Sequence, residues 1–399
     1  MNAPAHPAVM SAQILDILER TRQIAQGLTA RGAAVEQAGQ LDAQTISEVV
    51  EAGIMTLGVP TRYGGLEVDY ETIPMVSRLL GKGCLATSWT IGILLQHNLQ
   101  MGLFPQEAQD EFWSQGPSCF APGFIVPGGI ARPVPGGFKL TGHWRFGSGY
   151  PHGQWILLTA HEEIEGKKGR ALRFALPRAE TQAHNNWKVS GLAGSGTWDC
   201  QLQDVFVPAH RHMPASGMLD GTAPGVAVNT GPLWRIPMLS FYYPNMSSMV
   251  LGAALGVADQ VLEKMKGRTL AYGGANAADL SYMRANTARG FTVLNAATAL
   301  MDAECLRIGE ASRAGRSFTT EERAAVRANC TWIVKQSRAV IQDFCDQAGT
   351  SSFFLDSPLQ RFHREVSVMS SHSFYDADRM YDVYGKALFG QDIPAGELL

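Results

Sequence analysis

The chain has 399 residues, of which 45% are apolar and 17% charged, and its formal net charge is −3. This composition predicts a globular protein of about two or three domains, and it gives no electrostatic case for binding nucleic acid or an anionic membrane. Because we find neither a targeting signal nor a run apolar enough to span a bilayer, we expect a cytoplasmic protein. Its six cysteines are scattered without zinc-site spacing, so no metal is expected.

The segment up to about Trp113 is predicted to be helical. Apolar residues recur with a period near 3.6, and Gly32 and Gly53 are natural stops after the first two helices. Pro60 and the Gly64-Gly65 pair predict a turn before the third helix. The fourth is apolar nearly all round, so it should be buried, and it contains His97. The predicted helices are 11–31, 45–52, 70–81 and 85–100.

From Gly116 onward the pattern becomes that of β-strands. Gly136-Gly137 predicts a hairpin turn, and the β-rich stretch continues to about Pro208. We expect a β-sandwich or barrel here, followed by a Gly-, Ala- and Pro-rich linker over 209–231 with possible lid character. The strongest strand signals lie at 138–140, 155–159, 172–176 and 200–207.

The last segment returns to long, periodic, Ala-rich helices, which predict a bundle. These helices are expected at 246–266, 280–309, 319–348 and 359–384. The predicted fold class is therefore α+β. Its three parts are an N-terminal α-helical domain (1–115), a middle β domain (116–230) and a C-terminal four-helix bundle (231–399).

One stretch, TGHWRFGSGYPHGQWILL over 141–158, carries a possible binding surface. In a regular strand Trp144, Phe146 and Ser148 would project to one face, and Gly147 and Gly149 would let a flat ligand approach the backbone. Two rings and a hydroxyl on one wall suit a flavin. The alternative is an ordinary core strand that contains a turn.

Four passages resemble the acyl-CoA dehydrogenase superfamily, and within it the oxygenase components of two-component flavin-dependent monooxygenases. TGHWRFGSGYPHGQW is similar to the flavin strand of the monooxygenase branch, which typically reads G-x-W-x-F-x-S-G-x-x-H, and SPLQRFHREVSVMSSH resembles its last helical region. GIMTLGVPTRYGGLEVDY and WKVSGLAGSGTWDCQLQDVFVP resemble the superfamily more generally. The resemblance spans nearly the whole chain and implies an acyl-CoA dehydrogenase-like fold.

Within this superfamily, the resemblance separates dehydrogenases from monooxygenases by the type of residue, glutamate or histidine, near the final helical motif. A dehydrogenase needs a carboxylate base, usually a glutamate after the final helical motif, and the corresponding run SFYDADRMYDVYGKALFG has none. His372 stands where the monooxygenase branch has its histidine. The resemblance thus implies a reduced-flavin-dependent monooxygenase that inserts one oxygen atom from O2 into an aromatic or hydrophobic small molecule through a flavin C4a-hydroperoxide. The alternatives are an acyl-CoA dehydrogenase-type flavoprotein and oxygenation at nitrogen or sulfur.

The resemblance also implies residue roles, each with core packing, a turn or a solvated surface as its alternative. His372 corresponds to a general base or a hydrogen-bond partner of the peroxide, His97 to a histidine over the flavin, and Ser148 to a hydroxyl at flavin N5. Cofactor contacts are implied for Trp144, Phe146, Gly149, Ser195, Thr197 and, toward a neighbouring subunit's flavin phosphate, Arg268. Candidate substrate-pocket residues, equally suited to a core, are Trp89, Phe120, Phe241, Tyr242 and Tyr243.

We find no nicotinamide-binding motif in the sequence, and this bears on how the flavin would be reduced. Gly194-Ser195-Gly196 does not have the G-x-G-x-x-G spacing and precedes a strand, so a Rossmann nicotinamide site is not expected. A separate NAD(P)H:flavin reductase should supply reduced flavin by diffusion. The run DQAGTSS is a looser version of the superfamily's Q-x-x-G-G, which leaves reduced FMN and reduced FAD both open. The superfamily's usual assembly implies a homotetramer.

Overall fold

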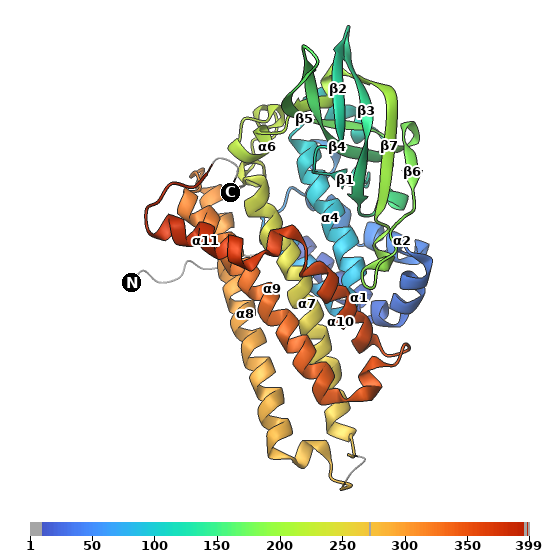
Figure 1. Cartoon of the computed structure of the whole chain (residues 1–399), viewed down its shortest axis with the longest axis vertical. Coiled ribbons are helices and arrows are strands. Elements are labelled where there is room, and N and C mark those ends of the chain that lie inside the picture. Colours follow the sequence, from blue (N-terminus) through green and yellow to red (C-terminus); the bar gives the residue numbers. More distant parts are fainter. Residues whose placement is uncertain (1–9, 271–272, 395–396, 398–399) are drawn as a thin grey trace.

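The computed structural model describes residues 10–270, 273–394 and 397. A helical part, a sheet and a second helical part follow one another along the chain (Figure 1). This order confirms the predicted fold class. The sheet lies at one end of the molecule, and α4 and α7 run beneath it, side by side, into the bundle.

The N-terminal helices are α1 (Ala12–Ala38), α2 (Ala43–Glu51), α3 (Thr72–Gly83), α4 (Leu85–Gly102) and α5 (Gln106–Phe112). The predicted stop at Gly32 is wrong, because α1 continues to Gly39, whose backbone is left-handed with φ of 69°. Gly32 instead lies where a Cβ would come within 2.5 Å of the Arg361 guanidinium, so this glycine permits close packing. Every residue of α4 is buried, as its apolar pattern predicted.

The strands within the described residues are β1 (Gly123–Phe124), β2 (Gly129–Val134), β3 (Gly137–Gly147), β4 (Trp155–Ile164), β5 (Lys167–Pro177), β6 (Gln182–His184), β7 (Trp198–Pro208) and β8 (His212–Pro214). They form one sheet in the order β6-β7-β3-β2-β4-β5-β8, with β1 paired to β4. Val134 faces Gly137 across the predicted hairpin turn. Strand residues such as Phe138, Leu140 and Phe174 make a hydrophobic cluster of their own, so the sheet curls around a separate core.

The linker predicted over 209–231 is partly structured. It contains β8, which adds an edge strand beside β5, and the short helix α6 (Gly217–Asp220). Gly225 donates its backbone N–H to the carbonyl of Leu103 over 2.8 Å, so this segment is fastened to the end of α4. A three-residue edge strand is too short to give a periodic signal in the sequence.

The C-terminal helices are α7 (Met238–Gly267), α8 (Ser281–Arg313), α9 (Thr320–Ala348), α10 (Pro358–Met369) and α11 (Ala377–Leu388). The single helix predicted over 359–384 is wrong, because the chain breaks after Met369 into the 3-10 turn Ser373–Tyr375. His372 caps this turn and Asp376 caps α11, each by accepting a backbone N–H. A side chain that accepts a backbone N–H in this way stabilises a turn at that position and so competes with a continuous helix.

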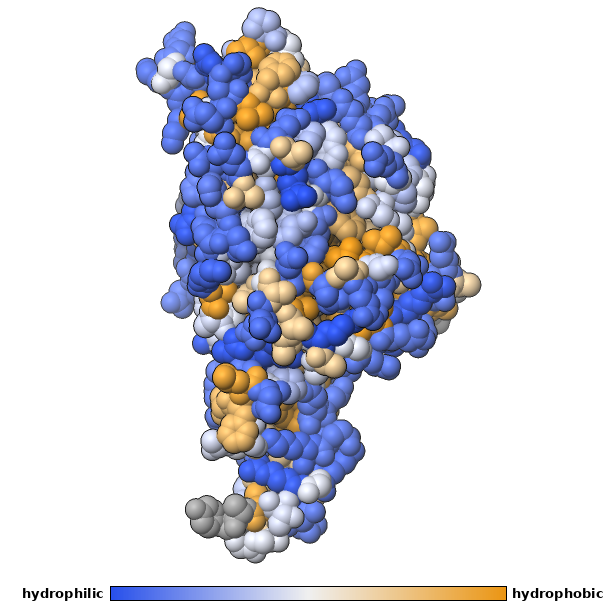
Figure 2. All heavy atoms as spheres, turned by 90° about the vertical axis from the view of Figure 1, so that its right-hand side faces the viewer, coloured by the Kyte–Doolittle hydropathy of each residue, from blue (hydrophilic) through white to orange (hydrophobic). Residues whose placement is uncertain are grey.

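Polar residues cover most of the molecule's face in Figure 2, while apolar residues gather in a band across its middle and near its narrow end. In the part of the chain that the structure describes, none of the helices has the combined length and apolar character needed to cross a bilayer.

Glycines set the distance between α3 and α7. A Cβ on Gly252 would lie 2.1 Å from the carbonyl oxygen of Arg78, and one on Gly81 would lie 2.5 Å from that of Met249. Real Cβ atoms do not approach backbone oxygens so closely, so the two helices could not pack at this distance with larger residues.

We therefore expect Gly252→Ala to lower the free energy of unfolding by about 1–3 kcal/mol through overpacking. Gly385→Ala is the matched control, because Gly385 lies in helix α11 with no atom within 4 Å of its added Cβ. There alanine should be neutral or slightly stabilising. Chemical denaturation of the three proteins measures the difference, and equal midpoints for the two variants would contradict this account of the packing.

Candidate active site

A cavity of about 490 Å³ opens where α4, the sheet, α7 and the segment after α10 meet. Its volume lies in the range of small-molecule and cofactor sites. Its lining comes from segments spread over most of the chain. The lining residues are Trp89, Ile93, His97, Gly123, Ile125, Val126, Arg145, Phe146, Ser148, Trp187, Leu192, Thr197, Tyr242, Met246, Val368, Met369, Ser371, His372, Ser373 and Phe374.

A second hollow, of about 600 Å³, lies between α1 and α2. This hollow is open to solvent. Arg31 and Glu48, which line it, form an ion pair with 2.6 Å between nitrogen and oxygen. Neither residue is free to bind a ligand, so we take the cavity beside α4 as the candidate site.

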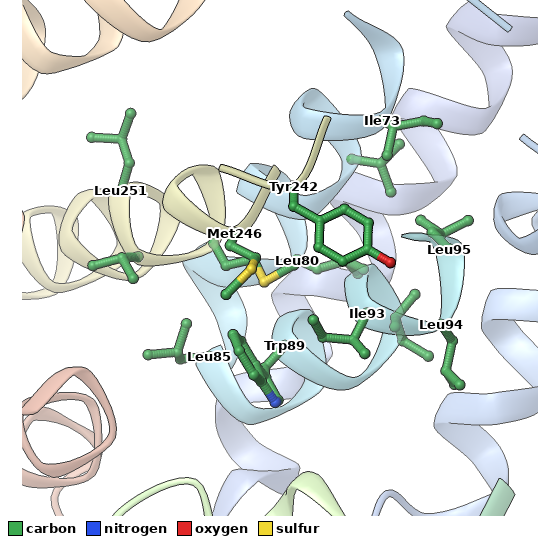
Figure 3. Packing of buried hydrophobic residues seen from close by; sticks show 14 of the residues in the cluster. Ile73, Leu80, Leu85, Trp89, Ile93, Leu94, Leu95, Tyr242, Met246 and Leu251 are labelled. Carbon is green, nitrogen blue, oxygen red and sulfur yellow. The ribbon is translucent and has the colours of Figure 1, made fainter. Parts of the chain in front are cut away.

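The spacing of residues on α4 sets the length of the cavity. Trp89, Ile93 and His97 are four residues apart, so they lie on one face of the helix and span about 12 Å. Trp89 and Ile93 face Tyr242 and Met246 of α7 in Figure 3. The cavity thus has one end near Trp89 and another near His97.

At the Trp89 end, hydroxyl groups form a hydrogen-bonded chain. The indole Nε1–H of Trp89 donates to Ser148 Oγ over 2.9 Å, and Ser148 Oγ lies 2.9 Å from Thr197 Oγ1. Thr197 in turn lies 2.7 Å from Ser195 Oγ, and Ser195 is buried behind it. Ser148 and Thr197 line the cavity, whereas Ser195 supports them from behind.

The prediction that Trp144 and Phe146 share a face is wrong. The pairing of β3 with β7 is irregular between Trp144 and Gly147, and Phe146 has a positive φ of 72°. Trp144 is buried in the core of the sheet and donates to the carbonyl of Thr159 over 2.6 Å, while Phe146 turns to the cavity. Asp199 holds the irregularity by accepting the backbone N–H of Phe146 over 3.2 Å. A bulge breaks strand alternation, which a two-residue spacing cannot reveal.

Aromatic rings and one cation form the mouth of the cavity. Phe146 packs edge to face against Trp187 with ring centroids 5.9 Å apart, and the guanidinium of Arg145 lies 4.5 Å from the centroid of the Phe146 ring. Trp187 is fixed by donating its Nε1–H to the carbonyl of Leu192 over 3.0 Å. This mouth offers a flat apolar surface with a positive charge beside it.

His97 is held neutral at the inner end of the cavity. Its side chain is 2% exposed, and its Nδ1 is buried without a hydrogen-bond partner in the described structure. Burial, followed by the positive charge of Arg173, lowers the pKa of His97 to about 3. A ring with that pKa is not protonated near neutral pH, so His97 has one N–H donor and one acceptor nitrogen and carries no charge there.

His372 has a different environment at the cavity rim. It remains accessible to solvent within a recess of protein, and partial desolvation lowers its pKa. Its Nδ1 accepts the backbone N–H of Phe374 over 3.2 Å, so in the neutral ring the proton is on Nε2. Its ring lies 6.1 Å from that of Trp89 and 4.9 Å from that of Phe374. As placed, His372 offers an N–H donor, and proton uptake at Nδ1 would break the bond to Phe374.

Several predicted residues lie outside the cavity lining. Tyr243 stacks on Phe374 and binds Arg327 through its hydroxyl, and Phe241 packs against Tyr70. Also outside the lining are Phe120, which is buried, and Gly149, which donates its backbone N–H to the carbonyl of Ser195. Those that do line it are Trp89, His97, Phe146, Ser148, Thr197, Tyr242 and His372.

Arg268 lies far from the cavity of its own chain. It follows the last turn of α7, about 33 Å along the helix from Met246. Its Nη1 donates to the carbonyl of Gln347 over 2.6 Å, and its guanidinium lies against Gly349. The structure therefore joins Arg268, for which the resemblance implies contact with a neighbouring subunit's flavin phosphate, to the run DQAGTSS, which resembles the superfamily's Q-x-x-G-G.

Arg145, Trp187 and Arg173 are among the residues around the cavity that sequence reasoning missed. Arg145 and Trp187 stand inside quoted motifs, but nothing in their spacing distinguished them from surface residues. Arg173 carried a usable signal, because a charged residue interrupts an apolar strand over 172–176. A strand that is buried on both faces leaves such a residue no route to solvent.

The cavity fits the isoalloxazine ring of a flavin. It offers apolar and aromatic walls and two hydroxyls, those of Ser148 and Thr197. The polar edge of the isoalloxazine ring needs hydrogen-bonding groups, and its flat apolar body needs apolar or aromatic walls.

Two family models match the chain. "Acyl-CoA dehydrogenase, N-terminal domain" matches residues 12–115, and "Acyl-CoA dehydrogenase, C-terminal domain" matches residues 245–377. Together they cover both helical parts and leave the sheet between them.

Similar proteins extend over nearly the whole chain. The oxygenase subunit HsaA of a flavin-dependent monooxygenase from Mycobacterium tuberculosis is 29% identical over 92% of this chain and 93% of that protein. The oxygenase component of p-hydroxyphenylacetate 3-hydroxylase from Acinetobacter baumannii is 26% identical over 95% of this chain and 90% of that protein. The crystal structure of the HsaA monooxygenase from M. tuberculosis has a TM-score of 0.90, with 27% identity over 96% of this chain and 98% of that one.

The buried His97 should make stability depend on pH. Its pKa is about 3 in the folded protein and about 6.5 when unfolded, so between these values the unfolded chain binds the extra proton. Stability attributable to His97 is therefore full above about pH 6.5 and falls as the pH drops toward 3, by at most about 1.4 kcal/mol per pH unit. Denaturant midpoints for the wild type and His97→Gln across this range measure the effect. Parallel pH curves would contradict it.

Proposed function

The chain belongs to the acyl-CoA dehydrogenase family, and we propose that it is the oxygenase component of a two-component flavin-dependent monooxygenase. It uses reduced flavin and O2 to insert one oxygen atom into an aromatic or hydrophobic small molecule. The relatives at similar coverage are hydroxylases and monooxygenases.

The composition of the cavity lining carries this proposal. No aspartate or glutamate is among the described residues that line it, whereas two histidines are. A dehydrogenase that removes a proton next to a thioester carbonyl needs a base of adequate pKa, usually a carboxylate in this family. His97, with its pKa near 3, is a poor base, and His372 presents an N–H. The site is better suited to orienting and hydrogen-bonding than to removing a carbon-bound proton.

The flavin ring would lie at the Trp89 end of the cavity. Ser148 and Thr197 would hold its polar edge, and Phe146 with Trp187 would cover its flat face. Reduced flavin, when bound, supplies the electrons that activate O2. Because Trp89 donates to Ser148, the Ser148 hydroxyl is oriented and can donate its own proton to the ligand or to Thr197.

The substrate would occupy the inner end, between α4 and α7. Ile93 and Met246 give it an apolar surface, and Tyr242 and His97 give it polar contacts. His372 would close the site at the rim, where its Nε2–H can donate to an oxygen of the substrate or cofactor. These walls exclude water from the reacting groups, which strengthens each hydrogen bond made there.

The chain would work with a separate reductase and with copies of itself. We propose that an NAD(P)H:flavin reductase delivers reduced flavin, since relatives are named as oxygenase subunits or components. We also propose a homotetramer, in which Arg268 beside Gly349 reaches the flavin of a neighbouring subunit. Their distance from the cavity of their own chain supports this arrangement. The six unpaired cysteines suit a reducing cytoplasm.

The proposed function is tested by supplying chemically reduced FMN or FAD, isotopically labelled O2 and a panel of phenols to the purified protein. We expect a hydroxylated product that carries one labelled oxygen atom, without any nicotinamide present. The competing activity has a separate readout, because an acyl-CoA dehydrogenase would bleach bound oxidised FAD when acyl-CoA is added without oxygen. Bleaching, or absence of label in every product, would contradict the proposal.

Substitution of His372 separates its two possible roles. His372→Ala should lose about 10²-fold or more in hydroxylation while H2O2 is still released. His372→Gln places an N–H donor near the position of Nε2, so it should recover part of the activity if the ring acts as a donor. If His372 instead acts as a base, His372→Gln should be as inactive as His372→Ala.

His363→Ala is the matched control. His363 is on the preceding helix α10, its pKa is also lowered by burial, and it binds Gln342 outside the cavity. Its substitution should leave product yield and H2O2 release unchanged. Full hydroxylation by His372→Ala would exclude a catalytic role for His372.

A further inference from the structure

Asp199 is a buried carboxylate that lies opposite the bulge in strand β3. It is 3% exposed. The regular pairing of β3 with β7 stops at Trp144 and resumes at Gly147, and Asp199 is the one β7 residue within this gap. Two β3 residues, Arg145 and Phe146, therefore oppose a single β7 residue, which is the definition of a bulge. The residue that faces the bulge carries the charge.

The two oxygens of this carboxylate bind the two segments that carry the aromatic rings of the cavity mouth. Asp199 Oδ1 accepts the backbone N–H of Phe146 over 3.2 Å. Asp199 Oδ2 accepts a side-chain N–H of Asn186, the residue before Trp187, over 2.8 Å. Hydrogen bonds to a charged acceptor are stronger than neutral ones, and burial keeps water from competing for them. One side chain thus fixes the backbone near both rings.

The same carboxylate also holds the cation of the mouth. The Nε of Arg145 lies 3.9 Å from Asp199 Oδ2, and the Nε2 of His143 lies 3.1 Å from this oxygen. The guanidinium of Arg145 is the group that lies over the ring of Phe146. Because opposite charges attract, Asp199 keeps Arg145 on the side of the strand where it covers this ring.

Phe146 needs such a constraint, because its backbone is in an unfavourable conformation. Its φ of 72° lies in the left-handed region, which residues with a Cβ rarely adopt. A residue is held there only where its surroundings determine the conformation, and such residues gather at ligand sites. The bond from its N–H to Asp199 is a buried contact that supplies this constraint.

We propose that Asp199 is a positioning residue that holds Phe146 and Trp187 together as one preorganised surface against which the flavin ring binds. The inference rests on the proposed function. Asp199 is not among the residues that line the cavity, so it acts through the two rings, whose centroids are 5.9 Å apart. A surface that is fixed before binding loses less conformational entropy when the ligand arrives. Its position also decides how well water is excluded from the reacting groups.

The first test needs no flavin. Hydrogen exchange followed by mass spectrometry would compare the flavin-free wild type with Asp199→Ala and Asp199→Asn. We expect faster exchange in Asp199→Ala over residues 143–149 and 185–190, while β4 and β5 exchange as in the wild type. Asparagine has one carbonyl oxygen, so it can replace only one of the two acceptors and should give an intermediate effect. Faster exchange throughout the sheet would mean general destabilisation and would refute a positioning role.

The second test measures whether Asp199 acts through the ring of Phe146. Titrations with FMN and with FAD, followed by flavin fluorescence, would compare the wild type, Asp199→Ala, Phe146→Ala and the double variant. We expect Asp199→Ala to weaken binding by about 10-fold in the presence of the ring. Where Phe146 is already alanine, the same substitution should weaken binding by only about 3-fold or less. A loss of general stability would instead act equally in both backgrounds.

Asp204→Ala is the matched control. Asp204 is on the same strand, at the other irregularity in the pairing of β3 with β7, and it also has a positive φ, of 53°. It pairs with Arg132 at 3.0 Å and lies outside the cavity lining. Its substitution should leave flavin affinity and the exchange of residues 143–149 and 185–190 unchanged.

Three results of the titrations would overturn the inference. They are equal flavin affinities of the wild type and Asp199→Ala, an equal loss in both backgrounds, and binding of neither flavin by the wild type. Oxygen insertion is assayed separately with reduced flavin and O2. A protein whose flavin affinity depends on Asp199 in this way, but which oxygenates none of its substrates, would refute the proposed function and leave the role of Asp199 supported.

Discussion

A helix buried on every side is the constraint on which this structure depends. Every residue of α4 is buried, so its polar side chains can find partners only inside the protein. Trp89 reaches the sheet at Ser148, and Gln96 and Gln100 reach α7 at Tyr242. These bonds fix the sheet and the bundle on opposite sides of one helix. The cavity is the space left between the three elements.

Differences in burial also explain why the two histidines of the cavity differ in their protonation. His97, inside the helix beside Arg173, is held neutral, and His372, at the rim, is only partly desolvated. A neutral ring in a low-dielectric wall supplies orientation, whereas a ring near solvent can exchange protons. Groups whose environments separate their pKa values commonly divide roles in an active site.

Two departures from regular backbone geometry bring Phe146 and His372 to the cavity. The bulge in β3 turns Phe146 toward the ligand space, and the break after α10 places His372 at a cap. In both cases a polar group stabilises the irregularity locally, Asp199 in the sheet and Asp376 at the start of α11. Such departures from regular geometry are common beside functional sites, because they re-aim a side chain that a straight element would point elsewhere.

The sequence by itself determined the order of the helices and strands, the burial of α4 and seven of the 20 residues that line the cavity, because apolar periodicity and short motifs are local properties of the chain. His97, Ser148 and His372 were identified from such motifs. Only the tertiary structure decided that Trp144 faces the core and Phe146 the cavity, since a bulge depends on the partner strand. It alone showed that Arg173 is buried with no aspartate or glutamate of the described residues paired to it, because the groups around a buried side chain come from residues distant in the chain.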